Sequence, residues 1–542
     1  MSELLIELFS EEIPPGLQIN ARKQLEKLLI DELKELNLNY KTLKLFSTPT
    51  RLTLVVSGLP NKIKISATEI KGPKIGVPEN IIENFEKSKE LNVSDLYEKK
   101  LDKGTFYFAK TKERELNTAK ELEKILPKIF SEISWKKSMK WSDYNLAWGR
   151  PLRSILAIFD QKKLSFKYTH LETVNFTILE LFTELKEKKV KDFIEYSNFL
   201  RQHSIILDHE ERLKYISQKI ISICKNKSCS ENIDQNLLLE VSNLVDQPRV
   251  IIGKFDKNYL DLPQEIIKST LQSHQRYFTL TDKKERIINE FVIVINNKDE
   301  KKIIKTGNER VVEARLADAN FFWHRDRSLN LIKQINKLKH VTFYENLGSI
   351  YDKTQRLRKM AYFISDQLSL NREKIEIAAS VSKSDLVSGL VGEFPELQGV
   401  MGKYFAMTQG FDEDISRAIS EHYLPIGISS PVSKKPVSYA LSIIDKLDTL
   451  VGFYLIDEKP TSSKDPYALR RSAIGMLKMI LENNKELKLK DLINYSCQLY
   501  SEQNINFNSK NVQKDLSEFF YDRYKNFMKE KEIRNDIIES VT

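Results

Sequence analysis

The chain has 542 residues, of which 41% are hydrophobic and 30% are charged, a balance typical of a soluble globular protein with several domains. Its formal net charge of +10 is compatible with a polyanionic partner but does not demand one. No run of about 18 apolar residues occurs, so no transmembrane helix is predicted. The acidic N-terminus argues against a signal peptide, and three cysteines are too few for a disulfide framework, which favours a reducing cytoplasm.

The first 160 residues predict an α+β module. Alternating apolar residues predict strands at 3–9, 43–46 and 52–56. Helical periodicity predicts helices over 17–36 and 117–132, the second with Asn117 as its N-cap. Lys71-Gly72-Pro73-Lys74 is predicted to be a turn, and as a phosphate-binding loop it is only a weak signal.

The segment SWKKSMKWSDYNLAWGRPLR (134–153) mixes aromatic and basic side chains. Its tryptophans, Trp135, Trp141 and Trp148, stand among three lysines and two arginines, with one acidic residue. Basic groups beside exposed rings suit single-stranded nucleic acid. The alternative, which we favour for the tryptophans, is that they anchor the core while the lysines form a solvated rim.

Residues 161–330 carry weaker signals. Helices are predicted over 182–189 and 207–223, and helix and strand alternate between 237 and 300. His203, Asp208 and His209 are interpreted as a surface cluster, because nothing nearby completes a metal-ligand set. Further along, Gly307 is predicted to open a helix in which Arg310 pairs with Glu313, and Arg315 with Asp318. Phosphate contact is the alternative for both arginines.

From about residue 331 the chain is predicted to be almost entirely helical. SDLVSGLVGEFPELQGVMGKYF (384–405) predicts two helices that meet at a corner, the second opened by Pro395. Gly399 and Gly402 are predicted to lie on that second helix, where they let another backbone approach closely. Asp385, Glu393 and Glu396 surround the corner, and solvated acids over a packed core are the plain interpretation. Pro436 is predicted to begin a further helix, flanked by Asp445, Lys446 and Asp448.

Several long motifs in order resemble the β subunit of bacterial tetrameric glycyl-tRNA synthetase. They are FSEEIPP with STPTRLTL, LPQE with SHQRYF, GNERVVEARLADANFF, the 384–405 segment, EHYLP, DKLDTLVGF and PTSSKDPYALRR. The resemblance is weakest over 161–205, where the family's glycine- and histidine-containing segment is not recognisable. SEFFYDRYKNF (517–527) resembles the beginning of the family's C-terminal anticodon-binding module, most of which we expect to be missing from this chain.

The resemblance implies an α2β2 heterotetramer that joins glycine to tRNA(Gly) in the cytoplasm. ATP and Mg are then used at the α subunit, and this chain binds none of them and carries no catalytic residue. It implies a multidomain fold, an α+β N-terminal half followed by a mostly α-helical, HD-like C-terminal half. The expected divisions are 1–160, 161–330, 331–505, and 506–542 as the start of a truncated anticodon-binding module. The expected RNA contacts are Arg276, Arg310, Lys464, Arg470 and Arg471.

Two alternatives stay open at this point. One is an HD-type metal-dependent phosphohydrolase, and the other is a stand-alone RNA-binding or scaffold protein. The chain contains no His-Asp dipeptide, and Ser384-Asp385 stands at the equivalent place. Serine is a poor replacement for imidazole as a metal ligand, so no metal is expected. The sequence also contains no GxxxxGK[ST] phosphate loop.

Overall fold

The structure is a computed structural model that describes residues 2–65, 69–89, 96–101, 104–110, 114–181, 184–427, 429–461, 464–484, 486–505 and 509–541. The chain divides into two compact units. Unit 1 comprises 1–253, 276–285 and 290–305, and unit 2 comprises 254–275, 286–289 and 306–542. No helix within the described residues is long and apolar enough to cross a membrane. The expected four-part division stays a prediction.

Unit 1 is organised on a mixed sheet in the order β11-β12-β9-β1-β3-β2, with β10 paired to β9. β1 is antiparallel to both β3 and β9, while β12 runs parallel to β9. The three strands expected in this part are confirmed. The strands are β1 (Ser2–Ser10), β2 (Thr42–Thr48), β3 (Arg51–Leu59), β9 (Leu152–Phe159), β10 (Lys162–Lys163), β11 (Lys167–Tyr168) and β12 (Leu171–Val174).

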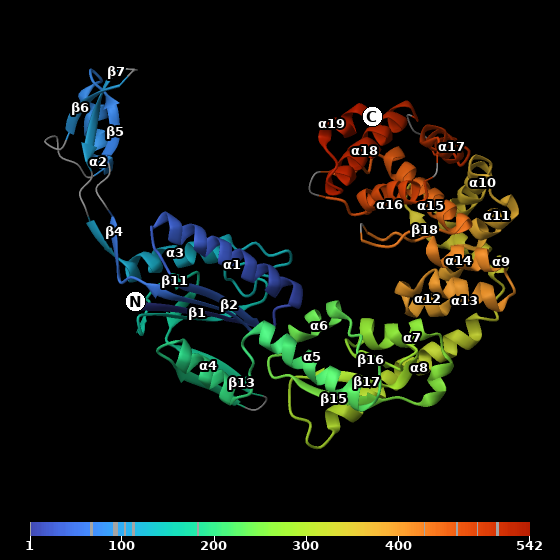
Figure 1. Cartoon of the computed structure of the whole chain (residues 1–542), viewed down its shortest axis with the longest axis horizontal. Helices are drawn as coiled ribbons and strands as arrows, with labels where there is room; N and C mark the ends of the chain where they lie inside the picture. The colour runs from blue at the N-terminus through green and yellow to red at the C-terminus, as the bar shows by residue number, and fades with distance from the viewer. Residues whose placement is uncertain are drawn as a thin grey trace. The chain divides into compact units, whose positions relative to one another are not determined.

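Both faces of this sheet are covered, because alternate residues of a strand point to opposite faces. Leu4 and Ile6 pack into the core that α1 (Pro15–Glu35) and α3 (Thr118–Glu132) cover, whereas Leu5 packs into the core beside α4 (Phe193–Gln202). Figure 1 shows α1 and α3 on one side of β1 and α4 on the other. Asn117 caps α3 by accepting a hydrogen bond from the N–H of Lys120 at 3.3 Å, as predicted.

Arg51 of the STPTR motif forms a buried ion pair with Glu7, which lies on β1 two residues before the FSEE motif. The Nε of Arg51 lies 3.1 Å from Oε2 of Glu7, and Tyr196 donates its hydroxyl to the same carboxylate at 2.6 Å. Burial raises the pKa of Glu7, although Arg51 opposes that rise. Removing one partner of such a pair would leave an uncompensated buried charge, so Arg51 of the STPTR motif serves the fold of unit 1.

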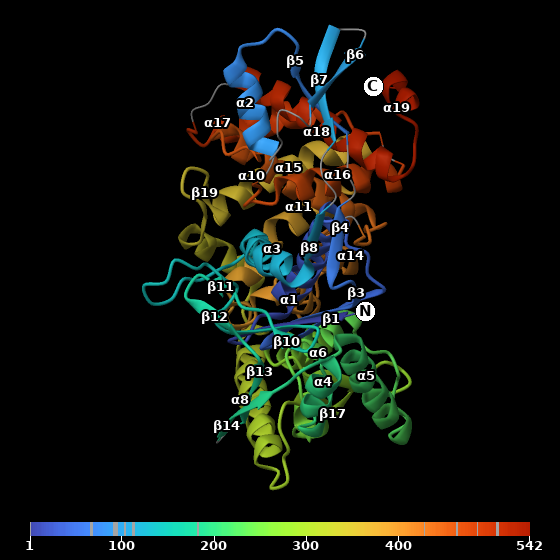
Figure 2. The same cartoon turned by 90° about the vertical axis from the view of Figure 1, so that its left-hand side faces the viewer.

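Two secondary-structure predictions in unit 1 are wrong. Lys71–Lys74 is not a turn but part of β5 (Glu69–Lys74), which joins β6 (Leu96–Leu101) and β7 (Gly104–Lys110) in a small sheet beside α2 (Glu79–Lys89) (Figure 2). The helix predicted over 182–189 is wrong, because β14 (Glu184–Lys189) is a strand that pairs with β13 (Phe176–Leu181) as a hairpin. Phe182 and Thr183 lie outside the described residues. β4 (Lys62–Ile65) pairs with β8 (Arg114–Asn117).

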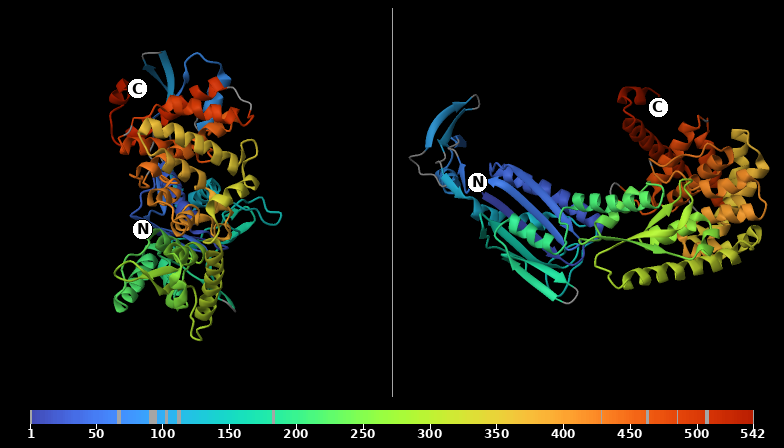
Figure 3. Two further views of the ribbon diagram at one scale, coloured as in Figure 1. Left: turned by 90° about the vertical axis from the view of Figure 1, so that its right-hand side faces the viewer. Right: turned by 60° about the horizontal axis from the view of Figure 1, so that its bottom comes forward.

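The middle of the chain alternates helices and strands, as predicted. β15, β17 and β16 form a three-stranded sheet in that order. α8 begins four residues before the predicted Gly307 and runs as one long helix (Figure 3). The elements are α5 (His209–Asn226), α6 (Gln235–Ser242), β15 (Arg249–Lys254), α7 (Gln264–Lys268), η3 (Ser269–His274), β16 (Phe278–Thr281), β17 (Ile287–Ile295) and α8 (Ile303–Asp326).

The rest of unit 2 is mostly helical, apart from the short hairpin of β18 (Thr342–Tyr344) and β19 (Gly348–Ser349). This confirms the predicted α half, although its HD-like character stays a prediction. α15 (Pro436–Leu455) begins at the predicted proline, and almost all of its side chains are buried. Around it lie α9 (Leu331–Gln334), α10 (Ile350–Leu368), α11 (Arg372–Val381), α14 (Glu413–Glu421), α16 (Leu469–Glu482), α17 (Leu489–Ser501), α18 (Ser509–Glu530) and α19 (Asn535–Val541).

Candidate functional site: a charged helical core beside a cavity

The corner at 384–405 is built around the buried carboxylate of Asp385. Its Oδ2 accepts hydrogen bonds from the backbone N–H groups of Gly399 and Gly402, at 2.6 and 3.1 Å. Burial raises the pKa of Asp385 to about 6, although these two N–H groups oppose the rise. Asp385 is therefore a structural acceptor and not the solvated acid that the sequence suggested.

The close approach of another backbone that was expected of the two glycines is confirmed for Gly399, whereas Gly402 is approached by side chains. A Cβ on Gly399 would lie 2.9 Å from the carbonyl oxygen of Ile419, and one on Gly402 would lie 2.6 Å from Cγ2 of Ile419. The predicted single second helix is wrong, however. Pro395 opens a short 3-10 turn, η6 (Pro395–Leu397), and Gly399 is the N-cap of α13 (Val400–Thr408) with a φ of +78°.

The other two carboxylates of the corner also have partners. Glu393 pairs with Arg315 of α8, so the predicted pairing of Arg315 with Asp318 is wrong. Oε1 of Glu396 accepts hydrogen bonds from the hydroxyl of Ser269 and from Nε2 of His274, the latter at 3.1 Å. Both acids thus tie the corner to α8 and η3 within unit 2.

A buried group of lysines and aspartates lies between α10 and α15. Nζ of Lys353 is 3.3 Å from Oδ1 of Asp445 and 3.3 Å from Oδ2 of Asp448. Nζ of Lys383 is 3.2 Å from the same Oδ1 of Asp445. Burial acts to raise the pKa of Asp445, but the two ammonium groups outweigh it and hold that pKa well below its usual range. Asp445 therefore stays ionised between two cations.

Asp448 is held on its other side by Arg356 of α10. Nε and Nη2 of Arg356 contact the two carboxylate oxygens at 2.7 and 3.1 Å, the bidentate geometry that guanidinium favours. Tyr500 of α17 donates its hydroxyl to the backbone oxygen of Asp448 at 2.9 Å. Burial tends to raise the pKa of Asp448, but Arg356 and Lys353 together outweigh it, so that the pKa is lowered. The pair fastens three helices together.

His422 completes this network as a neutral side chain. Burial, and then the nearby Lys383, lower the pKa of His422 well below its usual value. Its Nδ1–H donates to the backbone oxygen of Ile419 at 2.8 Å, so Nε2 is left to accept from Nζ of Lys383 at 2.7 Å. Both ring nitrogens are occupied by the chain itself, and neither is left to bind a ligand.

The charged core does not suit a metal ion. Within the described ranges, no group of three or more His, Cys, Asp or Glu side chains could hold one. Asp445 shares its carboxylate with two ammonium groups, which would compete with a metal cation for the same oxygens. Asp385 points its Oδ2 at backbone N–H groups. The donor set therefore disfavours the alternative of an HD-type phosphohydrolase.

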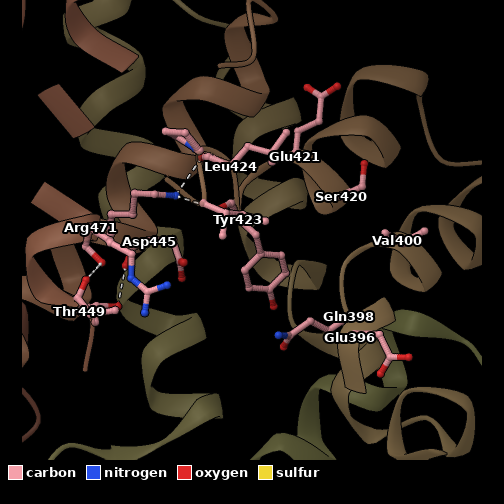
Figure 4. A pocket seen from close by; sticks show the side chains of 15 residues that line it. Glu396, Gln398, Val400, Ser420, Glu421, Tyr423, Leu424, Asp445, Thr449 and Arg471 are labelled. Atoms are coloured by element: carbon pink, nitrogen blue, oxygen red, sulfur yellow. Dashed lines mark hydrogen bonds between the residues drawn. The ribbon is translucent and has the colours of Figure 1, made fainter. Parts of the chain in front are cut away.

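A cavity of about 620 Å³ opens beside this core. Figure 4 shows the side chains of Gln398, Glu421, Tyr423 and Arg471 around it. Lys446 also lines it, but its Nζ donates to the backbone oxygens of residues 422 and 424 at 3.1 and 2.9 Å, and to Ser442 at 2.9 Å. Burial lowers the pKa of Lys446 to about 8.

Arg471 is a cation of the cavity lining that has no partner among the residues that the structure describes. It is exposed, and its side chain makes no ion pair or hydrogen bond with the part of the chain that the structure describes. Arg470 precedes it and donates to the backbone oxygen of Thr461, and the N–H of Lys464 donates to the hydroxyl of Thr461 at 3.2 Å. Three of the five predicted RNA-contacting residues thus lie together at the start of α16.

The other two predicted contacts lie elsewhere. Arg310, on α8, lines a separate hollow of about 730 Å³ with Lys254 and Lys257, and it forms no ion pair with Glu313. Arg276 belongs to unit 1, where its Nε lies 2.7 Å from Oε1 of Glu240. The structure does not test any of the five as an RNA contact, and that role stays a prediction.

Sequence reasoning missed most of the charged core. Lys353, Lys383 and His422 were not singled out, and Asp445 and Asp448 were expected only to flank α15. One signal was available: Asp445, Lys446 and Asp448 stand inside a helix whose other residues are almost all apolar. Charged residues are rarely fully buried unless they are paired, so such a helix predicts partners on its neighbours.

Comparison with known proteins identifies the family. A sequence model described as "Glycyl-tRNA synthetase beta subunit" matches residues 4–542. The protein named glycine–tRNA ligase beta subunit from Rickettsia canadensis (strain McKiel) is 38% identical over 538 residues, which is 98% of this chain and 78% of that protein. The Clostridioides difficile (strain 630) protein of the same name is 38% identical over 549 residues, 99% of this chain and 79% of that protein. The chain therefore belongs to the glycyl-tRNA synthetase beta subunit family.

Proposed function

We propose that this chain binds tRNA(Gly) and positions it for ATP-dependent glycylation at an active site on a partner α subunit. The observation that carries the proposal is the match to the family over nearly the whole chain. In this proposal the assembly is an α2β2 heterotetramer in the cytoplasm, and ATP and Mg act at the α subunit.

The chemistry of the helical core supports a positioning role. Asp445 and Lys446 line the cavity together with Glu396 and Glu421. Asp445, Lys446 and the neighbouring His422 are each bonded to the chain itself. A general base must reach a proton on the substrate, which these groups could do only after their network breaks. Positioning needs no such group, since holding two reactants in a productive orientation itself removes much of the barrier.

The cluster at the start of α16 suits the phosphate backbone of an RNA. Lys464, Arg470 and Arg471 lie close in sequence, and Arg471 has no protein partner among the described residues. Contacts from such side chains to phosphates fix the register of an RNA and make binding strongly dependent on salt. This cluster would therefore contribute to affinity and register more than to recognition of particular bases.

Reconstituted aminoacylation tests the proposal. The purified chain, the α subunit, and the mixture of both are each assayed with tRNA(Gly), labelled glycine, ATP and Mg. We expect near-background charging from each subunit alone and full charging from the mixture. Full-rate charging by this chain alone would refute the positioning role, and a mixture no more active than the α subunit alone would refute the partnership. Asp457→Ala, at an exposed site, serves as the matched control for protein handling.

A further inference from the structure

Residues 139–148 of unit 1 form a loop that is closed at its base. The N–H of Met139 donates to the oxygen of Trp148 at 2.9 Å, and the N–H of Trp148 donates back at 3.2 Å. Trp148 is buried, and its ring lies 4.9 Å from that of Trp135. A Cβ on Gly149 would lie 2.4 Å from the Trp135 ring, so the glycine makes this packing possible. The expectation that tryptophans anchor this segment is confirmed for Trp148.

The loop presents a different aromatic ring to solvent. Tyr144 is 42% exposed, and its ring stacks on that of His170 with centroids 3.6 Å apart and an interplanar angle of 4°. Trp141 approaches His170 edge-on at 6.1 Å, which braces the histidine. No other ring among the described residues lies against Tyr144. A flat ring is therefore held in a fixed orientation at the surface.

Three lysines accompany this ring. Lys136, Lys137 and Lys140 are all exposed, and none of them forms an ion pair with any described residue. Nζ of Lys140 makes only a 3.5 Å contact to the side-chain oxygen of Asn145. Asp143 is the single acidic residue between 134 and 153. The loop thus concentrates unneutralised positive charge around an exposed aromatic platform.

We propose that residues 136–147, the Tyr144 loop, bind an unpaired stretch of RNA. Lys136, Lys137 and Lys140 would contact phosphates, and a base would stack on Tyr144. Both contacts are typical of proteins that bind single-stranded RNA, where each stacked base adds affinity without strict sequence choice. An acidic protein surface would pair with the lysines but has no use for a flat, pre-oriented ring. The proposal rests on the proposed function, for which tRNA is the RNA concerned.

The test measures binding of the full chain to a tRNA(Gly) transcript and to a short single-stranded oligoribonucleotide, each over a range of salt concentrations. The charge variant is Lys136→Gln/Lys137→Gln/Lys140→Gln. Its matched control is Lys23→Gln/Lys27→Gln/Lys34→Gln, three exposed lysines on α1 with the same change in net charge. The stacking variants are Tyr144→Ala and the conservative Tyr144→Phe.

We expect the charge variant to reduce the slope of log K against log salt by about 2, since each lost phosphate contact removes roughly 0.7 to 0.9 from it, while the α1 control keeps the slope. Tyr144→Ala should weaken RNA binding by about 5- to 100-fold, the range expected for the loss of one stacked base. Tyr144→Phe keeps the ring and should bind RNA as tightly as the unmodified chain.

Three outcomes would overturn the inference, and they separate it from the proposed function. If the unmodified chain binds tRNA and all loop variants bind equally well, the loop is not an RNA site while the proposed function stands. If the unmodified chain binds no RNA, both fail. If the charge variant keeps its RNA affinity but no longer assembles with the α subunit, the loop is a protein-contact surface.

Discussion

Replacing Asp445 with alanine should loosen the centre of unit 2. The carboxylate lies 3.3 and 3.2 Å from the ammonium groups of Lys353 and Lys383, whose side chains are 4% and 5% exposed. Removing one partner of a buried ion pair costs about 3–5 kcal/mol, because the remaining charge is left without a partner. Lys353 keeps Asp448, whereas Lys383 keeps the neutral His422 and the ring of Tyr423 but no carboxylate, so most of the cost falls on Lys383.

Hydrogen exchange read by mass spectrometry measures this effect locally, since peptides of α15 report on their own helix. At about 1.4 kcal/mol for each factor of ten, the expected loss speeds exchange in α15 by about 10²- to 10³-fold. Adding Lys383→Met to Asp445→Ala should recover part of the protection, because it removes the stranded ammonium group. Asp522→Ala, at an exposed position of α18, is the control and should leave α15 unchanged. Unchanged exchange in Asp445→Ala, or strictly additive losses in the double variant, would refute the argument.

Three further predictions concern the corner and the start of α16. Asp385→Asn should flatten the pH dependence of stability between about pH 4 and 6. The pKa of Asp385 is about 6 in the folded chain and 3.8 in the unfolded chain, so the carboxyl group stabilises the folded state increasingly as the pH falls below 6. Gly402→Ala should destabilise the corner by about 1–3 kcal/mol, since its Cβ would overlap Ile419. Arg470→Ala/Arg471→Ala should weaken tRNA binding and reduce its salt slope by about 1 to 2.

Each of these has a matched comparison. Denaturation of Asp385→Asn at pH 4.5 and 7 should differ less than that of the unmodified chain, and an equal difference would contradict the assignment. Gly392→Ala is the partner of Gly402→Ala: a Cβ there meets nothing within 4 Å, so it should be neutral or slightly stabilising. For the arginines, Lys488→Ala/Lys490→Ala changes two exposed lysines of unit 2, and an equal loss of slope there would remove α16 from the RNA site.

Local patterns predicted the elements whose signals are local. Pro436 and the apolar stripe after it predicted α15 because both act within one helix. Residues 182–189, which contain β14, were predicted to be a helix, and the Glu and Lys residues there have good helix propensity. The β13–β14 hairpin is stabilised by burial of residues such as Leu179 in a core shared with β1 and β9. These contacts are distant in sequence, so a short stretch of sequence does not reveal them. Gly72-Pro73 was predicted as a turn, but the strand accommodates it where the pairing of β5 with β7 shifts register.

The candidate site was harder to predict than the fold, for a physical reason. Which charges meet in a buried network depends on helix packing, so Lys353 and Asp448, 95 residues apart, leave no joint signal in the sequence. Asp385 was singled out correctly but interpreted as solvated, because a carboxylate that accepts from backbone N–H groups looks the same in sequence as one in water. Gly399 and Gly402 gave the better clue to a buried carboxylate, since their backbone N–H groups are the two that donate to Asp385.

The network also bears on the proposed positioning role. Lys353, Lys383 and Lys446 bring three positive charges into the core, and Asp445 and backbone oxygens receive them. Such a core holds its helices in one arrangement, because a shift that separates any pair exposes an uncompensated charge. The cavity wall built on it, with Arg471 at its edge, is therefore fixed before a ligand arrives. A surface that is fixed in advance loses little conformational entropy on binding, which is what orienting a long and flexible RNA requires.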